Sequence, residues 1–193
     1  MPKDTFFNLR DKRKQHLTEL AMEVFISKPY SEIKRNDLLE AMDLPAGTFH
    51  NYFEDKEDLY TYVLSTVQIK RLEPRSMVFK LFNPNADDTY NLNDKEKAMS
   101  ATLLDMPGEV AFRYIFSYYV EAYTPVFKEG LQKQINQGLY RQDLDLDLAS
   151  FYYLTSGFLR ALYAKKHGIE ADTREMDELN RKVNEGLKKV FQD

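Results

Sequence analysis

Residues 23–60 read EVFISKPYSEIKRNDLLEAMDLPAGTFHNYFEDKEDLY, and this stretch decides the fold. It predicts two short helices, over residues 35–42 and 46–52, on either side of a tight turn. Asp43 ends the first helix because aspartate tolerates a left-handed backbone without being glycine. Pro45 opens the second helix, where a missing amide hydrogen has no consequence. The stretch therefore predicts a helix-turn-helix.

The rest of the chain is expected to be helical as well. Apolar residues recur three and four positions apart both before and after the quoted stretch, as they do on one face of a helix. Pro107 and Gly108 interrupt this pattern, and Pro125 predicts a kink in the long helix that follows. Residues 76–82 are predicted as a short helical piece and residues 83–94 as a loop. The other expected helices occupy residues 9–27, 55–73, 94–105, 109–137, 147–167 (ended by Gly168) and 172–191 (capped by Asp172).

Composition supports an all-α protein of one or two small domains. The chain has 193 residues, of which 43% are hydrophobic, with only seven glycines and seven prolines. It contains no cysteine, which excludes disulfides, thiolate metal ligands and cysteine nucleophiles. No apolar run approaches the roughly 20 residues that cross a bilayer, and the first residues lack the apolar centre of a signal peptide. We therefore expect a soluble, cytoplasmic protein.

The charge distribution is uneven along the chain. The formal net charge is −4, which is unusual for a nucleic-acid-binding protein. Residues 1–35 nevertheless hold eight basic and five acidic side chains, whereas residues 36–60 hold one lysine and seven acids. Any contact with DNA must therefore use a few placed cations and backbone amides, with a shallow salt dependence.

The quoted stretch resembles the DNA-binding signature of the TetR family of bacterial transcriptional regulators. The resemblance runs from Phe25 through Asp37-Leu38 to the block Gly47-Thr48-Phe49-His50-Asn51-Tyr52-Phe53 and the helix start Asp55-Lys56-Glu57. It implies an N-terminal helix-turn-helix domain over residues 1–56. It also implies a helical domain for ligand binding and dimerisation over residues 57–193.

The resemblance also assigns DNA contacts to particular residues. Phe49 and Phe53, four residues apart, are expected to anchor the buried face of the recognition helix. Three further residues would approach bases, four would hold phosphates, and three at the start of the preceding helix would meet the DNA backbone. These are Ala46, Gly47 and Asn51 for bases, Thr48, His50, Tyr52 and Lys56 for phosphates, and Lys34, Arg35 and Asn36 for the backbone.

The sequence departs from the family pattern at three positions. The family usually has tyrosine at the position of His50, and glycine at Asp43 and near Pro29. A protonated imidazole is the better phosphate donor, so we expect DNA affinity to weaken as pH rises through the histidine range, about 6.5. The alternative is that residues 46–56 form a packed hairpin that has lost its DNA function.

The long helix after Pro107 is rich in aromatic residues spread round its circumference, which predicts a central, buried helix. In the family this helix lines the ligand cavity, where aromatic rings would stack on a flat or apolar effector. The alternative is that these rings are ordinary core and that Glu121 is solvated or salt-bridged. The expected ligand-binding residues are Phe112, Phe116, Tyr119, Glu121 and Tyr123.

The last two helices carry apolar residues on more than one face, which requires two packing partners. By resemblance, they form a four-helix bundle with a second copy of the chain. A dimer also places two recognition helices about 34 Å apart, or a small multiple of this, on a palindromic operator. The expected dimer residues are Phe158, Leu162, Leu179, Val183 and Leu187.

Two other classes of protein fit the sequence less well. An enzyme is disfavoured because His16, His50 and His167 are isolated and no Gly-rich phosphate loop or His-Glu metal pair is present. We therefore predict no catalytic residue, no metal and no cofactor. A helical ligand-binding or protein-interaction module without specific DNA binding remains the alternative. The favoured interpretation is a regulator, more often a repressor, that a small and largely apolar molecule releases from DNA.

Overall fold

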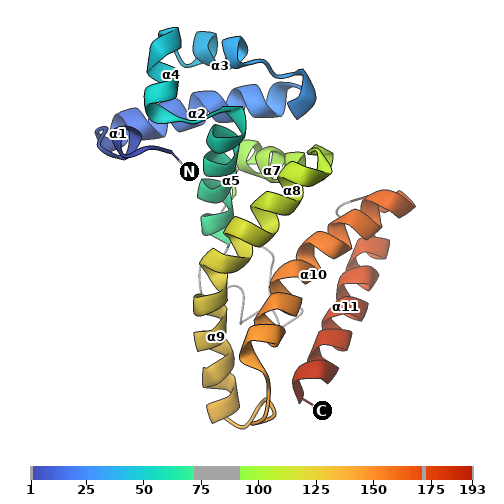
Figure 1. Cartoon of the computed structure of the whole chain (residues 1–193). Coiled ribbons are helices and arrows are strands. Elements are labelled where there is room, and N and C mark those ends of the chain that lie inside the picture. Colours follow the sequence, from blue (N-terminus) through green and yellow to red (C-terminus); the bar gives the residue numbers. More distant parts are fainter. Residues whose placement is uncertain (1, 72–91, 171–172, 193) are drawn as a thin grey trace. The chain divides into compact units, whose positions relative to one another are not determined.

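The computed structural model describes residues 2–71, 92–170 and 173–192, and the regular elements in these ranges are helical (Figure 1). The all-α fold class predicted from the sequence is therefore confirmed. The described residues pack into two compact units, one of residues 2–71 and 92–111 and one of residues 112–170 and 173–192. The predicted helical piece at 76–82 and most of the predicted loop at 83–94 lie outside the described residues.

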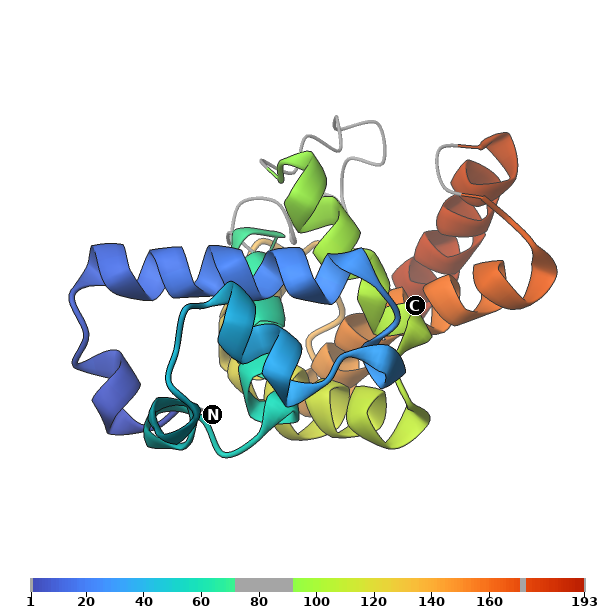
Figure 2. The ribbon, with the colours of Figure 1, turned by 90° about the horizontal axis from the view of Figure 1, so that it is seen from above.

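The first unit is organised around α2 (Asp11–Ser27), which contacts α3 (Arg35–Ala41), α5 (Lys56–Arg71) and α7 (Asp94–Ala101). Two short helices, α1 (Asp4–Phe7) and α4 (Ala46–Tyr52), lie against each other (Figure 2). The side chains between the helices are aliphatic and aromatic and exclude water, which stabilises the unit. Fully buried members of this core are Phe6, Leu17, Ala21, Leu38, Met42, Phe49, Phe53, Leu59, Val63 and Leu64.

Residues far beyond the helix-turn-helix also belong to the first unit. The hydroxyl of Tyr60 on α5 lies 2.8 Å from that of Thr102, in the 3₁₀ turn Thr102–Asp105 that follows α7. Gln68 Nε2 donates to Ser100 Oγ on α7 at 3.0 Å. The compact unit therefore extends past residue 56, which the resemblance gives as the end of the helix-turn-helix domain. Helices α5 and α7 pack against α2 and support the helix-turn-helix.

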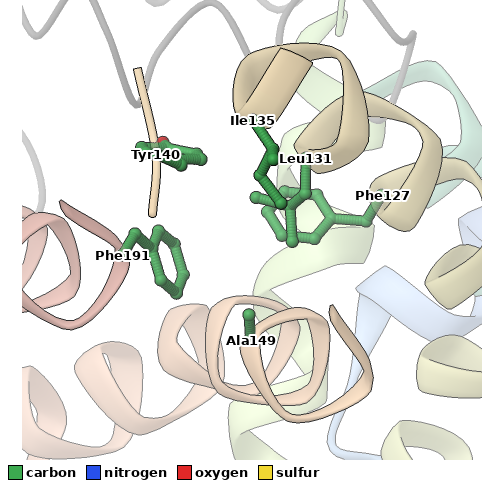
Figure 3. Close-up of a cluster of buried hydrophobic side chains, with 6 residues drawn as sticks. All are labelled: Phe127, Leu131, Ile135, Tyr140, Ala149 and Phe191. Carbon is green, nitrogen blue, oxygen red and sulfur yellow. The ribbon is translucent and has the colours of Figure 1, made fainter. Parts of the chain in front are cut away.

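The second unit consists mainly of α9 (Val120–Asn136), α10 (Leu146–His167) and α11 (Arg174–Gln192). Within it, α10 packs between α9 and α11 (Figure 1). One buried cluster joins all three helices to the connection between α9 and α10 (Figure 3). Its members are Phe127, Leu131, Ile135, Tyr140, Ala149 and Phe191. The ring of Tyr153 stacks on Phe127 at 4.3 Å and extends this cluster along α10.

Helix ends agree with the predictions in some places and differ in others. Gly168 ends α10 with φ 66°, as expected for a residue that must adopt the left-handed conformation. The long run after Pro107 starts as α8 (Gly108–Tyr114), passes through a π-helical stretch at Ile115–Tyr119 and continues as α9, which contains Pro125. The hydroxyl of Thr173 accepts a hydrogen bond from the amide of Met176 at the start of α11, whereas the predicted cap, Asp172, lies outside the described residues.

Candidate nucleic-acid interface

The two helices α3 and α4 meet at a tight turn, as the sequence predicted. Asp43 adopts φ 49°, the left-handed conformation expected for the residue that ends α3. The amide of Leu44 donates to the carbonyl of Leu39 at 2.9 Å and closes the turn. Phe49 and Phe53 are fully buried with ring centroids 5.5 Å apart, so the inner face of α4 is fixed to the unit. The outer face of α4 is thereby left exposed.

A carboxylate holds the start of α3. Asp37 Oδ2 accepts hydrogen bonds from Lys28 Nζ at 2.7 Å and from the Lys34 amide at 2.8 Å. The hydrogen bond from the Lys28 ammonium, followed by that from the Lys34 amide, lowers the pKa of Asp37 below its ordinary value. The positive end of the helix dipole also favours an anion there. Lys28 therefore ties the end of α2 to the start of α3.

Most of the residues predicted to contact DNA lie on the surface of this unit. The exposed ones are Lys34, Arg35, Asn36, Ala46, Gly47, His50 and Asn51, and the half-buried ones are Thr48 and Tyr52. Arg35 Nη1 lies within hydrogen-bonding distance of His50 Nε2 and so links the start of α3 to α4. A guanidinium only donates, so Nε2 of His50 is the acceptor in this contact.

Lys56 has a different environment from the other predicted contacts. Its ammonium donates to the carbonyls of Tyr30 and Ile33, both at 2.8 Å, and lies 3.9 Å from the centroid of the Tyr30 ring. Burial lowers the pKa of Lys56, and the charge of Asp37 opposes this shift. Lys56 therefore fastens α5 to the connection between α2 and α3, a role that the motif did not indicate.

The sequence analysis did not predict α1, which lies against α4. Its Phe6 is fully buried and packs against Phe53 at 4.8 Å and against Tyr62 at 5.1 Å. The amide of Lys3 donates to the carbonyl of Tyr52 at 2.8 Å. The apolar pair Phe6-Phe7 was the only available sign of this contact, and four residues are too few for a periodic pattern to be visible.

The predicted ligand-binding residues divide into two groups. Phe112 and Phe116 pack together at 4.4 Å, and Phe116 lies 5.8 Å from Phe151 on α10. Farther along, the ring of Tyr119 contacts the rings of Tyr123 and Phe158, with centroid distances of 5.0 Å in both cases. Phe116 and Tyr119 therefore lie on the side of the helical run that faces α10. The prediction of a helix buried all round is wrong for this chain by itself, since Phe112 is 63% exposed.

Glu121 is exposed, so the solvated alternative describes it better than a place among the tyrosines. It lines an open hollow of about 530 Å³ together with Val120, Thr124, Pro125, Lys128 and Asp147. In this hollow, Lys128 Nζ donates to both carboxylate oxygens of Asp147, at 2.8 and 2.9 Å. The hollow is partly apolar and carries both signs of charge, so it does not by itself define one class of ligand.

The predicted dimer residues also differ in their exposure. Leu162 is 51% exposed on α10, whereas Phe158 packs against Tyr119 and Leu187 packs against the buried cluster of its own unit. Leu179 and Val183 are half-buried on α11. Other apolar residues of these helices are exposed as well, and they are Leu148, Phe151, Tyr152, Leu159 and Tyr163 on α10 and Val190 on α11.

Comparisons with known proteins place this architecture. No family model matches the chain. The chain is 26% identical over 189 residues, 90% of its length and 91% of the relative's, to the HTH-type transcriptional repressor DhaR of Mycobacterium sp. (strain GP1). Among solved structures it is similar to the fatty acid degradation regulator FadR from Bacillus halodurans, with 18% identity, 93% and 96% of the two chains covered and a TM-score of 0.58. It is also similar to the regulatory protein TetR from Rhodobacter sphaeroides, with 16% identity, 92% and 97% covered and a TM-score of 0.51.

These features define an all-helical protein with an N-terminal helix-turn-helix, and its fold is that of the solved structures to which it is similar. The chain has the fold of the TetR family, as the motif at residues 23–60 predicted. The proteins it is similar to are named as regulators, and none of those given above is named as an enzyme. None of the helices in the described ranges is long and apolar enough to cross a membrane.

Proposed function

We propose that the protein is a ligand-responsive, DNA-binding transcriptional repressor of the TetR type. The single observation that carries this proposal is the arrangement of α4. Phe49 and Phe53 anchor its inner face, while Ala46, Gly47 and Asn51 stand exposed where base edges would be read. The small residues at 46 and 47 allow close approach of the backbone to DNA. Asn51 is suited to pair with an adenine edge.

The same proposal assigns the phosphate contacts to residues around α4. Thr48, His50 and Tyr52 lie on α4 itself, and Lys34, Arg35 and Asn36 lie at the start of α3. The third N–H of the Lys56 ammonium is available for a phosphate, because the two carbonyls use only two of its three donors. With DNA as its partner, the proposed location of the protein is the cytoplasm.

We further propose that the protein acts as a dimer through α10 and α11. Seven large apolar side chains of α10 and α11 are each at least 40% exposed, and Leu159 reaches 64%. Apolar side chains gathered on neighbouring helices favour association with a matching surface. A second copy supplies that surface and makes a four-helix bundle with Leu162, Leu179 and Val183 at its seam.

The effector is a small, largely apolar or aromatic molecule that binds beside the rings of Phe112, Phe116, Tyr119 and Tyr123. It acts by favouring a dimer in which the two recognition helices are wrongly spaced, so effector and operator weaken each other's binding reciprocally. The name of the Mycobacterium relative, a repressor, supports repression as the outcome of DNA binding.

The test is selection of bound duplexes from a random DNA pool with the purified protein, with Asn51→Ala and Asn136→Ala compared. Asn136 is an exposed asparagine at the end of α9, in the other compact unit, and so serves as a matched control. We expect one palindrome to be enriched by the wild type and by Asn136→Ala and to be lost or changed in sequence with Asn51→Ala. Absence of enrichment at low salt would contradict the proposal and leave a ligand-binding or interaction module.

A further inference from the structure

The last turn of the candidate recognition helix is held by the chain's N-terminal segment. Three successive carbonyls of α4 accept hydrogen bonds from just two residues of that segment. Lys3 Nζ donates to the carbonyl of His50 at 2.9 Å, Thr5 Oγ1 donates to the carbonyl of Asn51, and the Lys3 amide donates to the carbonyl of Tyr52 at 2.8 Å. The last four carbonyls of a helix have no partner within the helix. The N-terminal segment thus supplies the partners that α4 lacks.

Apolar packing also fixes the N-terminal segment against α4. Phe6 is fully buried, with its ring 4.8 Å from Phe53, 5.9 Å from Tyr52 and 5.1 Å from Tyr62. These rings belong to the end of α4, the residue after it and α5. The segment therefore stays in place when a polar donor of Lys3 or Thr5 is removed, so the donors can be tested without undocking it.

An ion pair also stabilises the contact between the N-terminal segment and the end of α4. The Lys3 ammonium also lies 2.7 Å from the carboxylate of Glu54, one residue beyond Phe53, and this contact lowers the pKa of Glu54. A cation at a helix C-terminus interacts favourably with the helix dipole. With only seven residues, α4 is too short to be stable as an isolated helix. Its last turn therefore depends on what surrounds it.

We propose that Lys3 and Thr5 are positioning residues for the recognition helix. They fix the turn that carries His50 and Asn51 before DNA arrives, and they act through α4 rather than by touching DNA. This inference rests on the proposed function, in which α4 is the recognition helix. The hydrogen bonds from Lys3 and Thr5 to α4 are nevertheless present in the free protein. The two parts are therefore tested by separate measurements.

The first measurement is amide hydrogen exchange in the free protein, comparing Thr5→Val, which removes the donor, with Thr5→Ser, which keeps it. Loss of one hydrogen bond is expected to speed exchange at residues 51–53 about fivefold, with α5 unchanged and with Thr5→Ser close to wild type. The control is Thr18→Val, which loses the hydrogen bond from Thr18 Oγ1 to the Lys14 carbonyl on α2. Unchanged exchange at residues 51–53 in Thr5→Val would overturn the inference.

The second measurement is affinity for the selected operator, at a temperature where every variant is fully folded. Thr5→Val is expected to bind about fivefold more weakly, because its frayed last turn must be ordered on the DNA. The salt slope should stay the same, since no phosphate contact is lost. Thr5→Ser and Thr18→Val should bind like wild type. Equal affinities for Thr5→Val and wild type would overturn the positioning role, whereas a wild-type protein that selects no duplex would overturn the proposed function and leave the exchange test intact.

Discussion

A substitution at Lys56 can separate the structural role of this side chain from its proposed contact with DNA. Replacing it with methionine keeps the length and apolar stem of the side chain but removes the charge and its donors. The change breaks two hydrogen bonds, to the carbonyls of Tyr30 and Ile33, and one contact with the Tyr30 ring. These interactions join α5 to the connection between α2 and α3, so their loss should destabilise the folded state.

The magnitude follows from the contacts. A hydrogen bond to a charged group contributes about 1.5 to 3 kcal/mol. Two such bonds are partly offset, because methionine avoids the desolvation of a half-buried ammonium and because water reaches the freed carbonyls. We therefore expect Lys56→Met to lower the free energy of unfolding by about 2 kcal/mol. Urea denaturation followed by circular dichroism, at one protein concentration for all variants, measures this change.

Lys166→Met is the matched control. Lys166 is exposed on α10 and, within the described ranges, makes no hydrogen bond or ion pair. Its replacement should change the free energy of unfolding by less than about 0.5 kcal/mol. If Lys56→Met were no less stable than Lys166→Met, the structural role assigned to Lys56 would be refuted. Operator binding provides a second readout, since the salt slope falls by about one when a phosphate contact is lost.

Two further predictions concern the dimer and acid stability. Leu162→Glu should give a monomer in analytical ultracentrifugation, because it places a charge on the exposed apolar face of α10. Leu139→Glu, at a leucine of similar exposure outside the helices, should remain dimeric. If both variants remained dimers, the proposed interface would be refuted. The hydrogen bond from Lys28 lowers the pKa of Asp37 in the folded state below its value in the unfolded chain. Asp37 therefore stabilises the folded state fully above about pH 4, and this stabilisation is lost as the pH falls through the folded-state pKa. Stability of Asp37→Asn should therefore fall less steeply than that of wild type below this pH, and equal slopes in acid denaturation would contradict the assignment.

The sequence by itself determined the helix-turn-helix, because its signals are local. Asp43, Pro45 and the spacing of Phe49 and Phe53 act within a few residues of one another, and each was found in the predicted conformation or burial. The glycine that ends α10 was predictable for the same reason. The motif also fixed which residues of α4 are exposed, since a helix with one anchored face must present the other to solvent.

Residue roles that depend on distant contacts could not be read from the sequence. Nothing near Lys56 in the chain indicates that its ammonium binds carbonyls at positions 30 and 33, because the contact arises only when α5 packs beside the connection between α2 and α3. The same holds for Phe158, whose apolar character fits a dimer seam or a core equally well until its ring is found against Tyr119.

The tertiary structure alone decided the part that the first residues play. Lys3 and Thr5 carry no pattern of their own, and α1 is too short to show helical periodicity. Their donors meet the carbonyls of α4 only because burial of Phe6 brings together distant segments, since Lys3 and His50 are 47 positions apart in the sequence. Local sequence specifies turns, caps and amphipathic faces, whereas a hydrogen bond between segments this far apart exists only after the chain has packed.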